Sequence, residues 1–508
     1  MARVAVAAAS QLSADVGRIV ADRGGNAIDV AIAAAIGSMC TDPGIIAPGC
    51  GGYISLWPAD GDPVVIDAYA EMPGRGLAPG RFGRGGSRVA MAYGGGMETI
   101  VGYGSVATPG AFAGLAEAQA RFGAIGWADV LDPVIDVVDA GFPLSPPAAE
   151  YLTYSHDVIF GWDPASYRAV HTDRGTPLAA GAVIHLPELA QSLRRIAEGV
   201  DVLYTGDLGR AIARETQAHG GLLTEQDLAS YEPIWRTPTV IDLSNWTIAT
   251  NPPPAVGGAA MAAMLLLLDR HGIEELTPVA IAYLARAQRA VVEFRRNRLE
   301  MVTDRLAEAE YLLEKARLGD LSSLLSSPST SHTSAVDDAA NACAITVSAG
   351  YGSGAMVPGT GMWLNNSLGE IELHPEGFHA LAPGTRLVSN MAPTVARRED
   401  GAVLAIGSPG ADRITTAVSQ VLMRTILLGM PVVEAIEAPR LHVEVFDGVP
   451  TVAHEPGIDD SLVEDLVPRP FSSKSMYFGG VQAAAWYPDE GLVAGADPRR
   501  SGGTAFAG

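Results

Sequence analysis

Residues 329–337 read Ser-Thr-Ser-His-Thr-Ser-Ala-Val-Asp, and this hydroxyl-rich stretch separates two parts of different character. Before it, residues 304–329 begin as a charged, helix-prone segment and end in a serine-rich run that is typical of a flexible linker. After it, residues 342–348 are β-prone and are followed by closely spaced glycines. We therefore expect a hinge near residue 329, between a helix-rich part and a strand-rich part.

The N-terminal part has the pattern of a sheet that is covered by helices. Residues 10–39 predict two helices separated by a break at Gly24 and Gly25, and the second helix is rich in small residues that allow close packing. Residues 53–57 and 64–68 predict strands, so we expect helices over a sheet. Residues 110–300 are expected to be mainly helical. Further strands are expected at residues 362–364, 402–406 and near 481–482.

The composition is that of a globular protein without affinity for nucleic acid. The 508 residues are 48% hydrophobic and 18% charged, and the formal net charge of −23 disfavours contact with phosphates. Cys40, Cys50 and Cys343 are widely spaced and are expected to be free, buried thiols in a reducing compartment. The N-terminus has a short apolar run, and the apolar segment at 261–268 is too short to cross a membrane. We therefore expect a cytoplasmic protein with no membrane partner.

The sequence contains weak signals for cofactors. The ten histidines lack paired metal-ligand spacing, so no metal is expected. No glycine-rich loop ends in Lys-Ser or Lys-Thr, which disfavours nucleoside triphosphates. Gly49 and Gly51 resemble part of a dinucleotide-binding motif, but they precede a strand instead of following one. We therefore expect no cofactor.

Residues 330–337, Thr-Ser-His-Thr-Ser-Ala-Val-Asp, resemble the Thr-Thr-His-Tyr/Phe-Ser-Val-Val-Asp motif that opens the small subunit of gamma-glutamyltranspeptidases. A hydroxyl-rich loop alone is not specific, but further family-like motifs occur in the family's order over nearly the whole chain. One of the most specific is Gly-Gly-Leu-Leu-Thr-x-x-Asp-Leu-x-x-Tyr at residues 220–231. The other matches lie at residues 24–31, 49–53, 108–110, 252–258, 364–366, 391–394, 407–410, 438–440 and 495–499. On these motifs the chain is identified as a member of that family.

The resemblance implies an α/β fold, a four-layer αββα sandwich of the N-terminal-nucleophile type. It also implies a precursor cut into a large subunit, residues 1–329, and a small subunit, residues 330–508, which stay paired. In this family the threonine hydroxyl attacks the preceding carbonyl, here that of Ser329, and the resulting ester hydrolyses. Thr330 would then supply the nucleophilic hydroxyl and, through its freed α-amine, the general base. The pKa of an ordinary α-amine, roughly 7.7–8.0, suits that role.

Three further residues take catalytic positions through the same resemblance. Ser348 stands where the family has a threonine whose hydroxyl helps to hold the nucleophile, and serine keeps the same donor and acceptor. Gly410 and Ala411 stand where two backbone amides form the oxyanion hole. Alanine keeps the N–H group, whose hydrogen bond to the developing charge is worth about 3–4 kcal/mol in such sites.

The residues that meet the α-carboxylate of glutamate in the family are altered here. The family's arginine is missing from residues 66–71, and its place falls at Tyr69 or at Ala70, depending on the end from which the run is aligned. Arg75 is a nearby candidate replacement, although a shifted guanidinium would not keep the same bidentate geometry. Of two family hydroxyls that meet the same carboxylate, one is retained as Ser389.

The second of those hydroxyls is replaced by Asn390, and the group that meets the α-amine is also changed. The family's asparagine falls at Gly350 or in a short deletion. Ser367 replaces a glutamine or glutamate, and Glu370 replaces an aspartate. We therefore expect Tyr69, Arg75, Ser389, Asn390, Ser367 and Glu370 to line a rebuilt substrate pocket.

These changes favour a hydrolase with an atypical substrate, because loss of a buried charged partner weakens binding strongly. Some family branches deacylate cephalosporins or act on oxamate. Others cleave a carbon–carbon bond beside a keto acid in lincosamide and pyrrolobenzodiazepine biosynthesis. The favoured hypothesis is a self-processing threonine hydrolase that acts on an oxalyl or keto-acid side chain in antibiotic biosynthesis, or on an amide. The alternatives are a γ-glutamyl hydrolase or transferase with a different pocket, and an inactive homologue that only binds.

Overall fold

The computed structural model describes residues 3–92, 96–300, 302, 304–319, 331–374, 376–410, 413–446 and 448–508. Two buried helices, α1 (Gln11–Asp22) and α2 (Ala27–Thr41), open the fold as the sequence predicts. The Ser10 side chain caps α1, and a capping box at Asn26 opens α2. Every residue of α2 is buried, because its small side chains let it pack against α1, α4 and the strands beneath it.

The first sheet has seven strands in the order β22-β1-β11-β12-β2-β3-β8, and all neighbouring pairs are antiparallel. Its strands are β1 (Val4–Ala8), β2 (Gly51–Trp57), β3 (Val64–Ala68), β8 (Ile234–Arg236), β11 (Ser331–Asp337), β12 (Ala342–Ser348) and β22 (Gly503–Ala507). Strand β1 lies between β22 and β11, so the start of the chain joins two strands of the C-terminal part. The two parts expected from the sequence therefore share one sheet.

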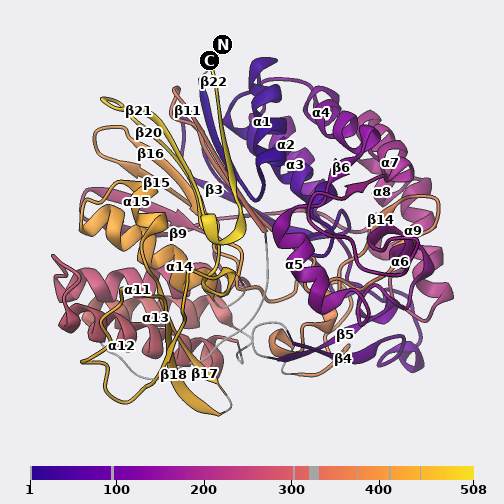
Figure 1. Ribbon diagram of the computed structural model, residues 1–508. Coiled ribbons are helices and arrows are strands. Elements are labelled where there is room, and N and C mark those ends of the chain that lie inside the picture. Colours follow the sequence, from indigo (N-terminus) through magenta and orange to yellow (C-terminus); the bar gives the residue numbers. More distant parts are fainter. Residues whose placement is uncertain are drawn as a thin grey trace.

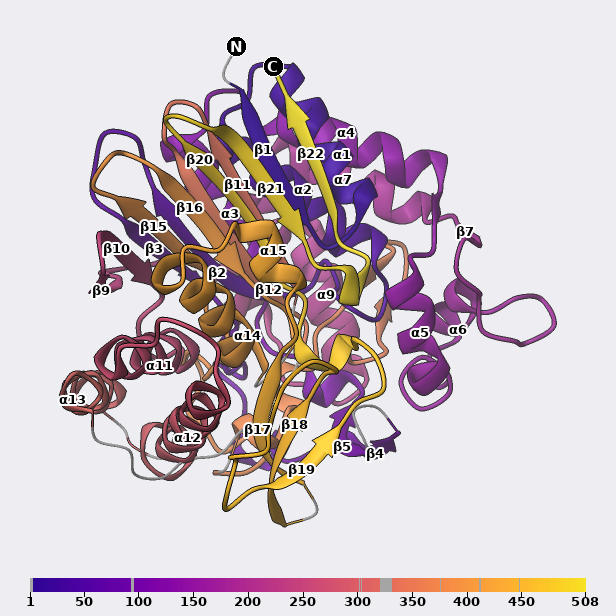
Figure 2. The ribbon, with the colours of Figure 1, turned by 60° about the vertical axis from the view of Figure 1, so that its left-hand side comes forward.

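The second sheet has six strands in the order β21-β20-β16-β15-β10-β9. Its strands are β9 (Thr239–Leu243), β10 (Trp246–Thr250), β15 (Thr394–Arg398), β16 (Val403–Gly407), β20 (Gln482–Tyr487) and β21 (Gly491–Ala496). The two sheets pack face to face (Figure 2), with small side chains such as Ala5, Ala344, Ala405 and Ala484 between them. These small residues allow the two sheets to approach closely.

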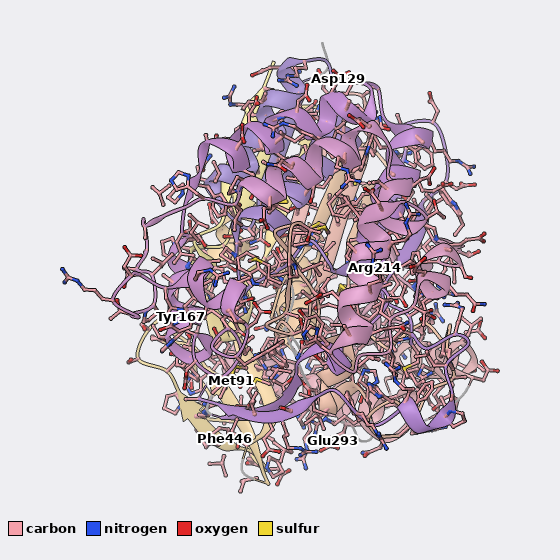
Figure 3. All side chains as sticks on the ribbon, turned by 90° about the vertical axis from the view of Figure 1, so that its right-hand side faces the viewer. Met91, Asp129, Tyr167, Arg214, Glu293 and Phe446 are labelled. Atoms are coloured by element: carbon pink, nitrogen blue, oxygen red, sulfur yellow. The ribbon has the colours of Figure 1, made fainter. Side chains whose placement is uncertain are left out.

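Helices cover the outer face of each sheet (Figure 1). Helices α1, α2, α3 (Ala111–Phe122) and α4 (Trp127–Ala140) cover the first sheet, while α11 (Gly257–His271), α12 (Pro278–Phe294) and α14 (Arg413–Leu422) lie on the side of the second. The outer helical surface is polar, as Asp129 and Arg214 show in Figure 3. The layers therefore run helix, sheet, sheet, helix, and the expected mixed α/β fold is confirmed.

The remaining elements border these layers. The other helices are α5 (Pro146–Ser155), α6 (Pro164–Val170), α7 (Pro187–Glu198), α8 (Asp201–Tyr204), α9 (Asp207–Ala218), α10 (Glu225–Ala229) and α15 (Val432–Glu437). Smaller sheets pair β4 (Ser87–Met91) with β5 (Met97–Val101), β6 (Phe142–Pro143) with β7 (Val183–Ile184), β13 (Met356–Val357) with β14 (Met362–Trp363), and β17 (Leu441–Phe446) with β18 (Val449–His454) and β19 (Val467–Pro470).

The first part of residues 304–329, predicted to be helix-prone, forms helix α13 (Arg305–Leu318). This helix buries Ala309, Leu312, Leu313 and Ala316 against α11. Residues 320–330 lie outside the described residues.

Two other expectations from the sequence concern the cysteines and the membrane. Cys40, Cys50 and Cys343 are free and buried, as predicted. Within the described ranges, no helix combines the length and the apolar character that a membrane crossing requires.

Candidate active site

The predicted catalytic hydroxyl of Ser348 lies at the end of β12, next to the start of β11. Ser331, the first residue of β11, pairs with Val347, and Ser348 itself pairs with Gly51 of β2. Ser348 is buried, and its Oγ accepts a hydrogen bond of 3.1 Å from the backbone N–H of Gly350. The predicted cleavage residues, Ser329 and Thr330, lie outside the described residues, immediately before Ser331 in the chain.

A chain of buried polar groups runs between the two sheets from this point. His332 Nδ1 lies 2.7 Å from Thr346 Oγ1, and His332 Nε2 lies 2.8 Å from Ser334 Oγ. Ser334 Oγ donates to the carbonyl of Gln482 at 3.2 Å, so it accepts from Nε2–H of the imidazole. Burial lowers the pKa of His332 to about 3, which keeps the ring neutral and fits that tautomer. The sequence marked His332 only as part of a motif.

The predicted oxyanion loop follows β16 and reaches the same end of the sheets. A Cβ on Gly407 would overlap the His332 ring, so the end of β16 lies directly against the start of β11. Gly410 has a φ of +125°, and a Cβ there would lie 2.8 Å from Gly479 Cα. The loop is also tied down by a 3.0 Å hydrogen bond from Gly480 N to Ser408 Oγ. Ala411, the second predicted oxyanion residue, lies outside the described residues.

Tyr69 follows β3 and forms one wall of the predicted substrate pocket. Its buried hydroxyl donates to Glu370 Oε1 at 3.4 Å, and its ring stacks on Tyr53 with 5.8 Å between centroids. The Tyr69 carbonyl accepts hydrogen bonds of 2.7 Å from both Tyr231 Oη and Arg386 NH1. Sequence reasoning did not assign this role to Tyr231 or Arg386, because their acceptor is a backbone atom.

Glu370 lies against Gly350, which replaces a family asparagine. Gly350 has a φ of +61°, and a Cβ there would overlap Asn366 Oδ1 and lie 3.1 Å from Glu370 Cδ. Burial, together with the nearby Glu372 carboxylate, raises the pKa of Glu370 well above its ordinary value. The Glu370 carboxyl therefore favours its neutral form. Ser367 is buried beside it and donates its backbone N–H to Asn365 Oδ1 at 3.0 Å.

Arg75, the proposed replacement for the missing family arginine, is already engaged. Its NH2 lies 3.0 Å from Glu71 Oε2, and its NH1 lies 3.3 Å from Asp227 Oδ1. Asp227 also accepts from the backbone N–H of Gly74 and of Arg75, so this guanidinium closes a turn. Two internal carboxylates thus hold Arg75, and its charge is not left for a substrate.

Ser389 and Asn390 are buried on the segment that leads into β15. Ser389 Oγ accepts from Met391 N at 3.1 Å, and Ser389 O accepts from Val256 N at 2.8 Å. Met391 shares a hydrophobic cluster with Tyr53 and Tyr69. The structure thus brings Tyr69, Ser367, Glu370 and the Ser389 segment together, whereas Arg75 belongs to a separate ion-pair group.

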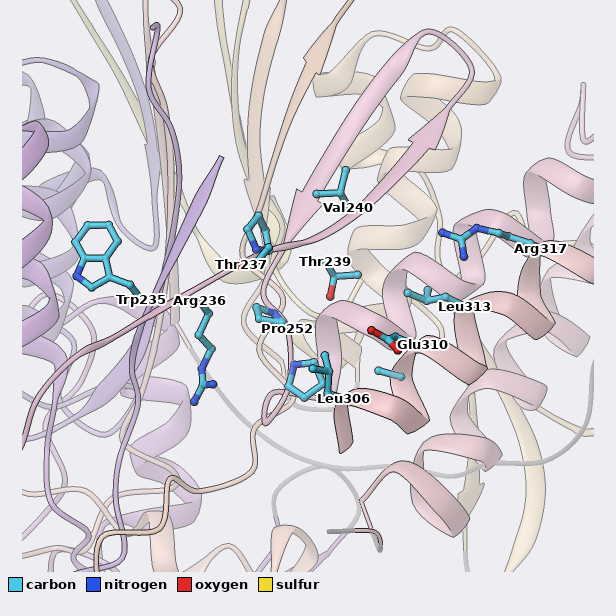
Figure 4. A pocket seen from close by; sticks show the side chains of 13 residues that line it. Trp235, Arg236, Thr237, Thr239, Val240, Pro252, Leu306, Glu310, Leu313 and Arg317 are labelled. Atoms are coloured by element: carbon cyan, nitrogen blue, oxygen red, sulfur yellow. The ribbon is translucent and has the colours of Figure 1, made fainter. Parts of the chain in front are cut away.

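A cavity of about 620 Å³ lies elsewhere, between the β8–β9 connection and α13 (Figure 4). Leu306, Glu310, Leu313 and Arg317 of α13 face Thr239 and Val240 across it. None of the predicted catalytic residues within the described ranges lines this cavity. It touches the candidate site through Pro252 and Pro253, whose loop continues to Ala255 beside Ser389.

Comparisons with known proteins bear on the family of the chain. The gamma-glutamyltranspeptidase family model matches residues 13–507. The chain is 32% identical over 513 residues to the acylase ACY 1 proenzyme of Pseudomonas sp. strain SE83, which covers 95% of this chain and 90% of that protein. It is 30% identical over 473 residues to the glutathione hydrolase proenzyme of Pseudomonas aeruginosa PAO1, with coverage of 86% and 82%.

The cephalosporin acylase from Bacillus halodurans has the same fold, with a TM-score of 0.78 and 24% identity over 99% of this chain and 96% of that one. The match of the family model over almost the whole chain, together with the acylase relative at 32% identity, decides the assignment. The chain is an enzyme and belongs to the gamma-glutamyltranspeptidase family of N-terminal-nucleophile hydrolases.

Proposed function

We propose that the chain cleaves itself between Ser329 and Thr330, and that Thr330 is the nucleophile of the resulting hydrolase. The observation that carries this proposal is the convergence of three features at one end of the sheets. Strand β11, which follows Thr330 in the chain, begins beside the Ser348 end of β12 and beside the loop from Gly407 to Gly410. The acylase and glutathione hydrolase relatives are named as proenzymes, which supports a precursor.

In self-cleavage the Thr330 hydroxyl adds to the Ser329 carbonyl carbon, and the peptide C–N bond breaks to leave an ester. That step also frees the Thr330 α-amine, and water then hydrolyses the ester to the free Thr330 hydroxyl and a carboxylate on Ser329. In turnover the α-amine takes the hydroxyl proton while the oxygen attacks a substrate carbonyl. The amides of Gly410 and Ala411 stabilise the oxyanion, and Ser348 orients the nucleophile. The bond to the leaving group then breaks, the leaving group takes the proton from the α-ammonium, and Thr330 carries the acyl group as an ester. Water hydrolyses this ester, while the two processed subunits stay together.

The substrate that we propose is not a γ-glutamyl compound. Tyr69 or Ala70 stands at the position of the family arginine, and Arg75 is held by Glu71 and Asp227. Next to Tyr69, Glu370 lies against Gly350 with its pKa raised by burial, so it is a poor partner for an ammonium group. A zwitterionic head group placed here would leave charges unmet, which is costly in a water-poor site.

A carbonyl compound without an α-amine fits the pocket better. We propose an oxalyl or keto-acid side chain, cleaved at a carbon–carbon bond in antibiotic biosynthesis, or an amide. The relatives named as an acylase and a cephalosporin acylase support an amide as the bond that is cleaved. The glutathione hydrolase relative supports the competing γ-glutamyl hydrolase or transferase.

Two measurements test the proposal. Denaturing gels and N-terminal sequencing of the purified protein should show a smaller fragment that starts at Thr330. The processed enzyme should then be assayed with a chromogenic γ-glutamyl anilide and with the matching oxalyl anilide, with oxalate release measured. An uncleaved protein that is still active would contradict the assignment of Thr330 as the nucleophile. Anilide turnover with kcat/KM of roughly 10⁴ M⁻¹s⁻¹ or above for the γ-glutamyl compound contradicts the substrate.

A further inference from the structure

Arg500 is a buried cation that the candidate catalytic machinery described so far does not use. It ends the short turn η9 (Pro498–Arg500) that leads into β22, and its side chain is 5% exposed. Its NH2 donates to the Met476 carbonyl at 3.3 Å, and its Nε has no hydrogen-bond partner. Within the described part of the chain, no carboxylate forms an ion pair with it. Arg500 therefore keeps donors and a charge that no group among the described residues meets.

The other buried arginines are compensated. Arg295, Arg386, Arg440 and Arg499 each form an ion pair with a carboxylate. Arg424 has no such pair among the described residues and its Nε has no hydrogen-bond partner, but its NH1 donates to Gln420 O at 3.2 Å and its NH2 to Pro439 O at 2.6 Å. The Arg500 guanidinium donates to only one carbonyl among the described residues. Because an unpaired buried charge is costly, an anion from outside the chain is the partner that would compensate Arg500.

The buried carboxylates at this turn are engaged by other arginines. Arg499 pairs with Glu455 and Asp497, and Arg440 also pairs with Asp497. They therefore leave the charge of Arg500 without a carboxylate among the described residues, in a chain of net charge −23. A local cation is what an acidic protein needs in order to hold an anionic ligand.

Arg500 also lies beside the predicted oxyanion loop. Its stem packs on Gly480, where a Cβ would lie 2.6 Å from Arg500 Cδ, and its NH2 lies 3.6 Å from the Cβ position of Gly410. Strand β1 pairs with both β11 and β22, and it sets Ala7 against Ser334 and Ala8 against Gly503. The start of β22, just after Arg500, is therefore at the same end of the sheet as the start of β11.

A neutral donor lies close to the same turn. Gln482 is fully buried in β20, opposite Gly407, and neither side-chain amide atom has a hydrogen-bond partner. Its Nε2 lies 3.2 Å from the Cβ position of Gly502, two residues after Arg500. A side-chain amide and a guanidinium from the same turn region are a suitable donor set for a carboxylate.

We propose that Arg500, assisted by Gln482, binds a carboxylate of the substrate beside the oxyanion loop. This inference rests on the proposed function, because the Gly410 loop is taken to border the scissile carbonyl. The proposal assigns carboxylate recognition to Arg500, which directly follows the family-like match at residues 495–499. Arg75 is not assigned this role, because Glu71 and Asp227 already hold it. The substrate class is then an acyl or keto compound with a free carboxylate near its scissile carbonyl, and without a nearby ammonium group.

Isothermal titration of the processed enzyme with oxalate and with glutarate tests the site directly, since these anions carry carboxylates at two different spacings. At least one of them should bind the wild type, and Arg500→Met should weaken that binding at least tenfold. Arg500→Lys should retain part of the affinity, because the charge remains but the planar fork is lost. The control Arg424→Lys, at a buried arginine whose NH1 and NH2 donate to carbonyls, should bind like the wild type. Oxamide and glutaramide should not bind.

The variants also separate this inference from the proposed function. Self-cleavage involves no external carboxylate, so Arg500→Met should still yield a fragment that starts at Thr330. Absence of binding of both anions to the wild type, or equal binding by Arg500→Met, overturns the carboxylate site while leaving self-cleavage intact. Loss of self-cleavage in Arg500→Met, with normal cleavage in Arg424→Lys, would mean that Arg500 supports the loop instead of the substrate. Failure of the wild type to cleave would instead contradict the proposed function.

Discussion

The start of β11 and the wall formed by Tyr69 and Glu370 are held in different ways. At the start of β11, backbone ladders set the geometry: Ser331 pairs with Val347, and Ser348 pairs with Gly51. At the wall, individual side chains set it, through the contacts of Tyr69 with Glu370 and of Glu370 with Gly350. A ladder tolerates a change such as serine for threonine, whereas a side-chain contact is specific to its pair. This difference explains how a family can retain its chemistry while it changes its substrate.

The largest effect should come from Thr330→Ala, which tests the region held by backbone hydrogen bonds, the start of β11. Without the hydroxyl the chain should remain one uncut band, and turnover should fall by about 10⁴-fold or more, as for loss of other catalytic nucleophiles. Gel analysis and turnover of an acyl anilide measure both effects. A Thr330→Ala protein that still cuts at this bond would place the nucleophile elsewhere. Thr330→Ser, which keeps the hydroxyl, serves as the matched control and should cleave.

Ser348 provides the next largest effect. Ser348→Ala removes the hydroxyl that accepts from Gly350 N and that we expect to orient the nucleophile, so kcat should fall by about 10²-fold, with KM changed little. Ser348→Thr should retain most of the activity, because the hydroxyl remains at the same position of the ladder. Equal rates for all three proteins would remove Ser348 from the site. A parallel rise of KM in Ser348→Ala would assign it to substrate binding instead.

A substitution at Gly350 tests the second region, the wall formed by Tyr69 and Glu370. Gly350→Ala places a Cβ on Asn366 Oδ1 and near the Glu370 carboxyl at a φ of +61°, so we expect a loss of about 2–3 kcal/mol in the free energy of unfolding. Gly359→Ala is the matched control, because Gly359 has a φ of +75° and no heavy atom lies within 4 Å of its Cβ position. It should cost about 1 kcal/mol from backbone strain alone. Urea unfolding measures both values, and equal losses would mean that Glu370 does not depend on contact with Gly350.

Features with a local signal could be predicted from the sequence. Helices α1 and α2 are framed by caps at Ser10 and Asn26 and by a glycine break, and both follow the predicted bounds closely. Strands β3 and β12 match the predicted ranges 64–68 and 342–348. The assignments of Thr330, Ser348 and Gly410 came from motifs and stay predictions.

Features that join distant residues could not be predicted. The pairing of β1 with both β11 and β22 joins segments more than 300 residues apart and leaves no periodicity in the sequence. The hydrogen bonds from Tyr231 and Arg386 end on a carbonyl, which every residue carries, so sequence patterns do not reveal them. The occupation of Arg75 by Glu71 and Asp227 likewise became visible only once Asp227, 152 residues away, was placed beside it.

The smallest effect that we predict concerns the charge state of His332, near the start of β11. Burial lowers its pKa to about 3 in the folded protein, against about 6.5 in the unfolded chain. The unfolded state therefore binds more protons between these values, so this contribution to stability is complete above pH 6.5 and is lost as the pH falls towards 3. At pH 5 the loss amounts to about 2 kcal/mol.

The measurement is the free energy of unfolding in urea at pH 7 and at pH 5. Between these two pH values it should fall in the wild type by about 2 kcal/mol more than in His332→Gln. The other titrating groups are common to both proteins and cancel in the difference. An identical pH dependence would mean that the folded protein protonates His332 as readily as the unfolded chain does, which would put a cation between the sheets beside β11 at pH 5.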